Sequence, residues 1–177
     1  KFYDSRSKIS VNGAFKATGT ASEKIVFTSL KDDSKGGDTN DDGNASTPDK
    51  GDWWCIVFNE SDRDTDNILK NCLLNYGARD QSGWADRKDY GTLRFFNALA
   101  EIDSCRIEQA HTSALGIFGS ANPSITNCDM HNVRLTPVTM SMFATPTFSN
   151  NTVSNLGIIA IGVAQETYAL DATIPQR

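Results

Sequence analysis

The feature that most limits how this 177-residue chain can fold is a repeat centred on one small residue. Three segments align without gaps around a cysteine and a fourth carries asparagine there, so the key positions are Cys72, Cys105, Cys128 and Asn151. The spacings between them are 33, 23 and 23 residues, and the polar segment 78–90 inside the first interval accounts for its extra length. A period of about 23 residues indicates a solenoid, in which each turn of the chain stacks on the one before.

Each repeat has the same order of apolar and small polar positions. The residues three before and two after the key position are apolar in all four units: Leu69, Ile102, Ile125 and Phe148, then Leu74, Ile107, Met130 and Val153. The residue just before the key position is small and polar: Asn71, Ser104, Asn127 or Asn150. Because side chains alternate between the faces of a straight strand, these apolar positions and the key position cannot all point inward from one strand. Two short strands must therefore meet at an Asn-lined bend between the position three before and the key position.

The predicted fold is all-β, a parallel β-helix of about six rungs in one domain over residues 1–177, with loop insertions at 31–52 and 78–90. Other strands are expected at 9–13, 24–28, 53–59, 92–97, 114–118, 138–143 and 157–163, which are rich in β-branched and aromatic residues. A leucine-rich repeat has a similar period, but the unit around Phe148 has no leucine at its inward positions. Because the sequence starts at Lys1 without Met, we also expect it to be a segment of a longer chain.

Several stretches resemble a known family. Residues 11–20, 24–29 and 51–58, followed by the Asn-Cys repeats, resemble right-handed parallel β-helix proteins of the pectate-lyase-like superfamily. More narrowly, the chain looks like the β-helix segments of large secreted or cell-surface bacterial proteins, and the resemblance covers nearly the whole chain. It implies an extracellular or cell-surface location in bacteria. It does not imply an activity, because the superfamily includes lyases, glycoside hydrolases, adhesins, phage tail spikes and structural modules.

The charge of the chain is concentrated in one insertion. Lys and Arg number 17 against 22 Asp and Glu, and the seven Asp and two Lys of residues 32–52 account for the whole net charge of −5. Such a chain lacks the basic surface that nucleic acids and anionic lipids require. The longest apolar run, residues 156–164, is far shorter than the roughly 20 residues that span a bilayer. We expect no nucleic-acid partner and no membrane insertion.

The cysteines are expected to be buried free thiols rather than disulfides. Three of the four occupy the same position in consecutive rungs, so a column of three leaves one sulfur unpaired whatever bonds form. A thiol can act as a small apolar side chain in a core. The predicted structural ladder consists of Cys72, Cys105, Cys128 and Asn151, with Asn71, Asn127 and Asn150 at the bend.

The strongest chemical motif lies in residues 38–49. Side-chain oxygens at positions 1, 3 and 5, Gly43 at position 6 and a carboxylate at position 12 follow the order in which EF-hand-type loops bind Ca²⁺. The last ligand is Asp where Glu is usual, as in the similar dockerin and thrombospondin-repeat loops, and no helices are expected beside it. The alternative is a solvated turn. The candidate Ca²⁺ ligands are Asp38, Asn40, Asp42, Asn44, Ser46 and Asp49.

No catalytic residue is predicted. The outward rung positions carry charged residues on two flanks rather than in one cluster: Lys70, Asp103, Arg106, Glu108 and Asp129. Asp103 and Asp129 lie in adjacent rungs but at different repeat positions, which does not favour a pair of glycosidase carboxylates. His111 and His131 have no Ser or Cys partner by motif.

Trp84 is the candidate ligand-binding residue, because an aromatic ring in a polar excursion suits stacking against a sugar. The alternative is that this ring caps the stack. The predicted function is a non-catalytic extracellular module acting as a stalk, an adhesive or a glycan-binding surface. The alternative is a polysaccharide lyase or glycoside hydrolase acting on an acidic polysaccharide. The expected partners are a polysaccharide or cell-surface glycan and neighbouring domains of the parent chain.

Overall fold

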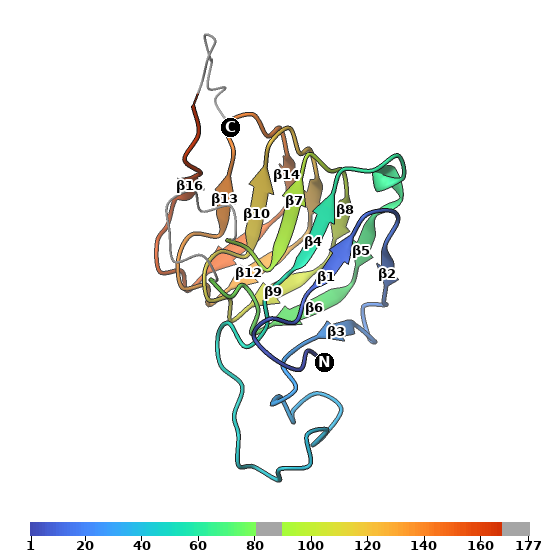
Figure 1. Cartoon of the computed structure of the whole chain (residues 1–177), viewed down its shortest axis with the longest axis vertical. Coiled ribbons are helices and arrows are strands. Elements are labelled where there is room, and N and C mark those ends of the chain that lie inside the picture. The colour runs from blue at the N-terminus through green and yellow to red at the C-terminus, as the bar shows by residue number, and fades with distance from the viewer. Residues whose placement is uncertain (81–89, 168–177) are drawn as a thin grey trace.

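The structure, a computed structural model, describes residues 1–80 and 90–167. Within these residues the chain winds into a three-sided stack of short strands (Figure 1). Each rung, meaning one turn of the winding, contributes one strand to each of three parallel sheets. Five complete rungs and the first strand of a sixth confirm the predicted parallel β-helix of about six rungs.

The three sheets run along the stack and are numbered here in the order in which the chain visits them. Sheet 1 contains β1 (Ile9–Val11), β4 (Ile56–Asn59), β7 (Leu93–Phe96), β10 (Leu115–Phe118), β13 (Val138–Met140) and β16 (Ile161–Val163). Sheet 2 contains β2 (Lys16–Thr18), β5 (Ile68–Lys70), β8 (Glu101–Asp103), β11 (Ser124–Thr126) and β14 (Thr147–Ser149). Sheet 3 contains β3 (Ile25–Phe27), β6 (Cys72–Asn75), β9 (Arg106–Glu108), β12 (Asp129–His131) and β15 (Thr152–Ser154).

Like residues of successive rungs lie in register, as the repeat predicts. In sheet 2 one inward file contains Leu69, Ile102, Ile125 and Phe148, and in sheet 3 another contains Leu74, Ile107, Met130 and Val153. Parallel strands of this kind bury their apolar side chains in files because every residue has a counterpart one rung above and below. The core is therefore one continuous cluster that is built from vertical files of like residues.

The predicted bend between the strands of sheets 2 and 3 lies one residue before the key position. All four residues there have a left-handed backbone, with φ between 50° and 55°: Asn71, Ser104, Asn127 and Asn150. A second left-handed bend follows sheet 3 at Tyr76, Gln109, Asn132 and Asn155. Asn is the side-chain-bearing residue that enters this region at least cost. The polar residues at these positions therefore turn the chain through its corners.

In the cysteine file, Cys72 is the first residue of β6, and Cys105 and Cys128 directly precede β9 and β12; all three are buried thiols without a disulfide. Each thiol of the file donates to the carbonyl oxygen of the inward sheet 2 residue one rung earlier, and the Asn151 amide makes the equivalent bond. The bonds run from Cys72 to Ala17 (3.4 Å), from Cys105 to Leu69 (3.5 Å), from Cys128 to Ile102 (3.6 Å) and from Asn151 to Ile125 (2.9 Å). Asn151 thus takes the place of the thiol as a donor.

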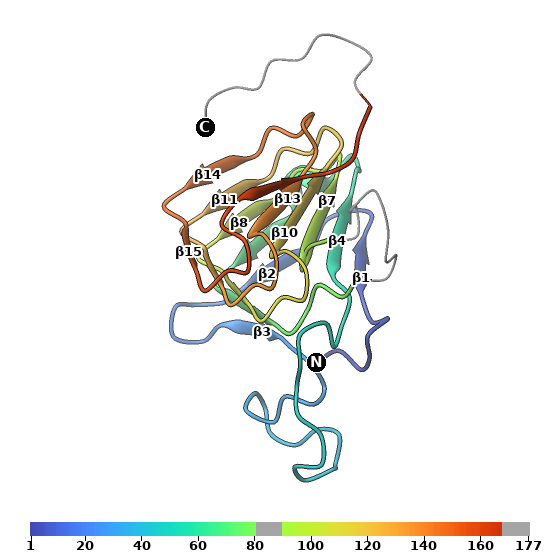
Figure 2. The same cartoon turned by 90° about the vertical axis from the view of Figure 1, so that its left-hand side faces the viewer.

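The acidic insertion, residues 31–52, follows β3 and projects from one side of the stack before the chain enters β4 (Figures 1 and 2). Where it returns to the stack, Trp53 is fully buried, its ring stacks on Phe2 at 4.0 Å, and its indole N–H donates to the Asn75 carbonyl at 2.6 Å. The loop therefore has a firmly anchored base. In the described parts of the chain, no helix combines the length and the apolar character needed to cross a bilayer.

Candidate functional site

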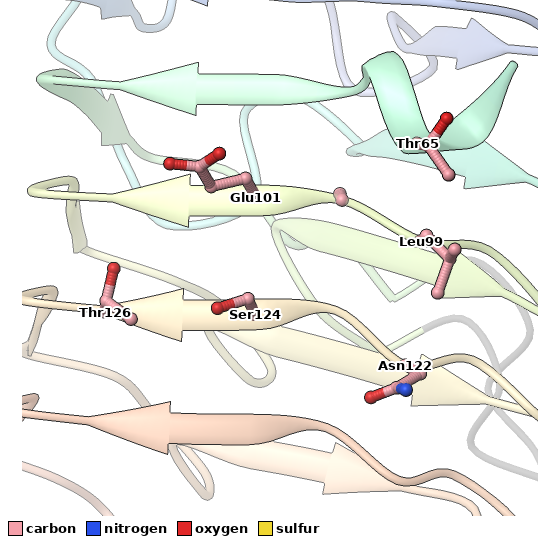
Figure 3. Close-up of a pocket in the computed structure, with 7 residues that line it drawn as sticks. Thr65, Leu99, Glu101, Asn122, Ser124 and Thr126 are labelled. Atoms are coloured by element: carbon pink, nitrogen blue, oxygen red, sulfur yellow. The ribbon is translucent and has the colours of Figure 1, made fainter.

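A shallow groove runs across the outer face of sheet 2 (Figure 3). Its volume is about 430 Å³, and its lining consists of Thr65, Leu99, Ala100, Glu101, Asn122, Ser124 and Thr126. One wall is the 3₁₀ turn Asp64–Asp66, which packs beside the chain entering β8 because the Leu99 N–H donates to Asp64 Oδ2 at 3.1 Å. The groove is therefore built on adjacent rungs of a rigid sheet.

The side chains of the groove offer several kinds of interaction to a ligand. Glu101 on β8 lies in register with Ser124 on β11, and Leu99 and Asn122 occupy the turns that lead into these strands (Figure 3). Leu99 is 36% exposed, which leaves an apolar surface among hydroxyl, amide and carboxylate groups. A concave site that combines an apolar patch with a few convergent polar groups is suited to binding a hydroxyl-rich small molecule.

Asp103, one of the outward positions singled out in the sequence, has a structural role beside this groove. Its carboxylate accepts hydrogen bonds from Asn127 Nδ2 at 2.8 Å, Lys70 Nζ at 2.9 Å and Thr126 Oγ1 at 3.1 Å. The bonds from Asn127 and then Lys70 lower the pKa of Asp103 to about 2. An ionised carboxylate with this many donors holds the bend of three rungs together and is unsuited to act as an acid.

The other outward charges belong to sheet 3. The Arg106 guanidinium pairs with Glu108 on its own strand and with Asp129 on the next rung at 3.0 Å. Thr152 Oγ1 also donates to Asp129 at 2.9 Å. Asp129 therefore lies on a different face from Asp103, so these two carboxylates do not meet across a shared cleft.

The acidic insertion brings together three carboxylates. Oxygen atoms of Asp33, Asp38 and Asp42 all lie within 4.8 Å of one another. The Gly43 N–H donates to Asp38 at 2.8 Å, and this bond is the main cause of the lowered pKa of Asp38. The positive φ of Asp41 (58°) and Gly43 (70°) folds the loop back on itself, which places Asp42 beside Asp38.

Three oxygen atoms in this cluster are buried and receive no hydrogen bond from residues 1–80 or 90–167: Asp33 Oδ1, Asn40 Oδ1 and Asp42 Oδ1. The Asn40 amide group instead donates to Asp42 Oδ2 at 2.7 Å and to Ser46 Oγ at 3.0 Å. Buried oxygens without donors are costly, and hard carboxylate and amide oxygens are the ligands that Ca²⁺ prefers. This set of oxygen ligands therefore fits a calcium ion.

The six predicted ligand positions are placed differently in the loop. Asp38 and Asp42 belong to the carboxylate cluster, and Asn40 and Ser46 are hydrogen-bonded to it. Asn44 is exposed, and the Asp49 carboxylate accepts the Lys50 backbone N–H at 2.7 Å, outside the cluster. Asp33 lies before the motif and is separated from it by Gly36 and Gly37, so no ligand spacing pointed to it.

Residues 52–173 match the family model described as right handed beta helix region. The chain belongs to the right-handed β-helix family. No curated protein and no solved structure gives a significant match to it. Membership of this family establishes how the chain winds. The function of the chain has to be argued from the sites on the surface of the β-helix.

The remaining residues singled out in the sequence lie elsewhere on the β-helix. Trp84 lies outside the described residues, as does most of the insertion 78–90. His131, on the outer face of sheet 3, forms a hydrogen bond with Ser154 Oγ at 2.9 Å. His111 lies in the turn after sheet 3, where its Nε2 is 2.8 Å from an Arg134 nitrogen. Neither histidine lines the groove.

Proposed function

We propose that this β-helix is a non-catalytic extracellular binding module that takes a glycan in the groove on sheet 2. The observation that carries the proposal is the groove itself, where Glu101, Ser124 and Thr126 stand beside the apolar surface of Leu99. Sugars present hydroxyl groups around apolar ring faces, and this lining complements both features. Because the side chains stand on paired strands, little conformational freedom is lost on binding.

Binding is favoured over hydrolysis because of the carboxylates near the groove. Glycoside hydrolysis requires two carboxyl groups that flank the scissile bond, about 5–10 Å apart. In the described residues, the groove lining contains one carboxylate, Glu101. The neighbouring Asp103 has a pKa of about 2 and accepts hydrogen bonds from three side chains. This arrangement supports recognition of a sugar without cleavage.

The glycan proposal is tested with a panel of neutral and acidic oligosaccharides, followed by calorimetry on those that bind. Glu101→Gln is expected to weaken binding about tenfold, because a hydrogen bond to a charged group contributes about 1.5–3 kcal/mol. Ser154→Ala, on the outer face of sheet 3, is the matched control and should bind as the wild type does. Binding that survives Glu101→Gln together with Ser124→Ala contradicts the groove assignment, and release of reducing ends or unsaturated uronates contradicts the non-catalytic role.

We also propose that the acidic insertion binds one Ca²⁺ ion. Asp33, Asp38 and Asp42 would hold the ion, together with the Asn40 side-chain oxygen. When bound, the ion supplies charge neutralisation for three carboxylates that otherwise repel one another. The role of the ion is therefore to order the loop between β3 and β4.

Calcium binding is tested by calorimetric titration and by limited proteolysis of the loop with and without chelator. Calcium is expected to slow cleavage within residues 36–48, because a ligand that binds only the ordered loop stabilises it by mass action. Asp42→Asn should abolish both the heat and the protection. Asp62→Asn, an exposed acidic residue outside the loop, is the control. A titration without heat, together with unchanged cleavage, removes the calcium proposal and leaves the glycan proposal intact.

A further inference from the structure

A cluster of cationic and neutral groups lies where the base of the acidic insertion meets the turn after sheet 3. We call it the basic corner and define it as Lys50, His111 and Arg134. His111 and Arg134 occupy equivalent positions of successive rungs, 23 residues apart. The backbone N–H of His111 donates to the Gly77 carbonyl, and the backbone N–H of Arg134 donates to the Ala110 carbonyl. The backbone of both residues is therefore fixed by the stack.

Lys50 is held against the same corner by the return of the insertion. Its ammonium group donates to Asn132 Oδ1 at 2.9 Å, and Asn132 donates in turn to Gln109 Oε1 at 2.8 Å. The next residue, Gly51, is buried and has φ of 85°, and a Cβ placed on it would lie 3.1 Å from His111 Cβ. Only glycine allows so close an approach at this backbone conformation. The loop base thus brings Lys50 to the corner by direct packing on His111.

The contacts within the basic corner use neutral acceptors. Lys50 donates to an amide oxygen, and an Arg134 nitrogen lies 2.8 Å from the ring nitrogen Nε2 of His111. Among residues 1–80 and 90–167, the ion pairs formed within 4.0 Å include none of the three members. Within the described part of the chain, no carboxylate oxygen therefore lies within ion-pair distance of the three side chains of the basic corner.

The charged groups around the basic corner are mixed. Burial, and then Arg134, lowers the pKa of His111. Asp80 and Asp49 oppose this lowering of the pKa of His111, and Arg79 adds to it. The Asp49 carboxylate also accepts a hydrogen bond from the backbone N–H of Lys50 at 2.7 Å. Burial also lowers the pKa of Lys50; the Asp49 carboxylate opposes this effect, and the positive charge of Arg134 adds to it. Like charges held near one another, with pKa values shifted by burial, are a recurring property of functional sites.

We propose that Lys50, His111 and Arg134 form a binding site for a tetrahedral oxyanion, a phosphate or sulfate group. A guanidinium fork can donate two parallel hydrogen bonds to such a group, while a lysine ammonium adds a compact point charge. A bound dianion would offset the repulsion between Lys50 and Arg134, whose positive charge lowers the pKa of Lys50. The site is separate from the groove and from the carboxylate cluster, so it can fail without affecting either proposal.

The experiment uses the two histidines of the chain as internal probes. Imidazole ¹⁵N resonances are followed by NMR at constant pH while phosphate, sulfate or glucose 6-sulfate is added. The His111 signals are expected to shift saturably with phosphate and sulfate, whereas the His131 signals stay in place. Glucose 6-sulfate separates the sources of the group, because its binding indicates a site for a pendant ester and its exclusion indicates a site for the free ion.

Three variants complete the test. Arg134→Gln and Lys50→Gln should each weaken the saturable shift at least tenfold, while far-ultraviolet circular dichroism reports whether each variant is folded. Lys16→Gln removes an exposed lysine that pairs with Asp66 at 3.4 Å, and it should leave the shift unchanged. An equal response to chloride or acetate at matched ionic strength, or parallel shifts of both histidines, overturns the proposal. So does full binding by either folded corner variant.

Discussion

At the N-terminal end of the stack the inward residues Val11 and Ala17 are buried, whereas in the last complete rung of the described chain the inward residues Phe148 and Val153 are exposed. In the first rung the small residue Ala17 pairs with Leu69 of the second rung. The ring of Phe15 lies against the rings of Phe27 and Phe58, at centroid distances of 6.5 and 6.2 Å. At the other end Phe148 and Val153 hold the same inward positions as residues of the middle rungs. The two ends thus differ in how they close the core.

The exposed fractions quantify this difference. Ile125 is fully buried and Phe148, one rung later in the same file, is 39% exposed; Met130 is 2% exposed and Val153 is 49% exposed. An inward position in the repeat does not by itself bury a side chain. Burial also requires a rung on each side of it along the stack. The same substitution should therefore have different effects along one file, because the free energy of burial follows the apolar area removed from water.

The largest expected effect comes from matched isoleucine truncations in the middle and at the end of the stack. Ile102→Ala removes a fully buried side chain and should lower the free energy of unfolding by about 2–5 kcal/mol. Ile161→Ala acts on a side chain that is 51% exposed and should cost below about 1 kcal/mol. Urea denaturation of both variants measures the difference. Equal losses would mean that the C-terminal end is covered in solution.

A smaller effect is expected at the left-handed bends. Asn127→Ala places alanine at φ of 53° and removes the hydrogen bond to Asp103, which should cost about 1–3 kcal/mol. Asn127→Gly accepts the same backbone conformation and should cost less, which separates the backbone term from the lost hydrogen bond. Asn155→Ala, at the bend of the last rung, should cost less than Asn127→Ala, and a reversed order in denaturant melts would contradict the comparison.

The smallest effect concerns acid. The pKa of Asp103 is about 2 in the folded chain against an ordinary value of 3.8, so its stabilising contribution is complete above about pH 4 and is lost as the pH falls towards 2. The contribution should stay below about 1 kcal/mol because the Lys70–Asp103 pair lies near the surface. Asp103→Asn should flatten the pH dependence of the melting temperature between pH 4 and 2. An unchanged slope would show that other groups dominate.

The period, the inward files and the bend positions were predictable because each recurs in four successive rungs. The first rung was harder to interpret, and β2 (Lys16–Thr18) was not predicted. It has Ala17 where later rungs have a large apolar residue, and Gly19 follows β2 where Asn71 follows β5. The predicted strands over residues 53–59 and 138–143 are shorter in the structure, Ile56–Asn59 and Val138–Met140, because each rung turns at several corners.

The surface sites were less predictable than the stack. The groove depends on Leu99 and Asn122, which lie in turns whose sequences differ from rung to rung. Lys50 meets Asn132 across 82 residues of sequence, and no local spacing encodes that contact. Asp33 joins Asp38 and Asp42 only because the intervening glycines turn the chain back. These sites arise from insertions and turns, for which the repeat supplies no template.

The buried cysteine file also offers a way to time the opening of single rungs. Because its three sulfurs are sealed within consecutive layers, a maleimide can modify each one only when that layer separates from its neighbours. Mass spectrometry of peptides carrying residues 72, 105 and 128 would then give a separate rate of opening for each layer. The layer after them carries Asn151 instead of a thiol, so fraying of that layer alone would cause no labelling of the three cysteines.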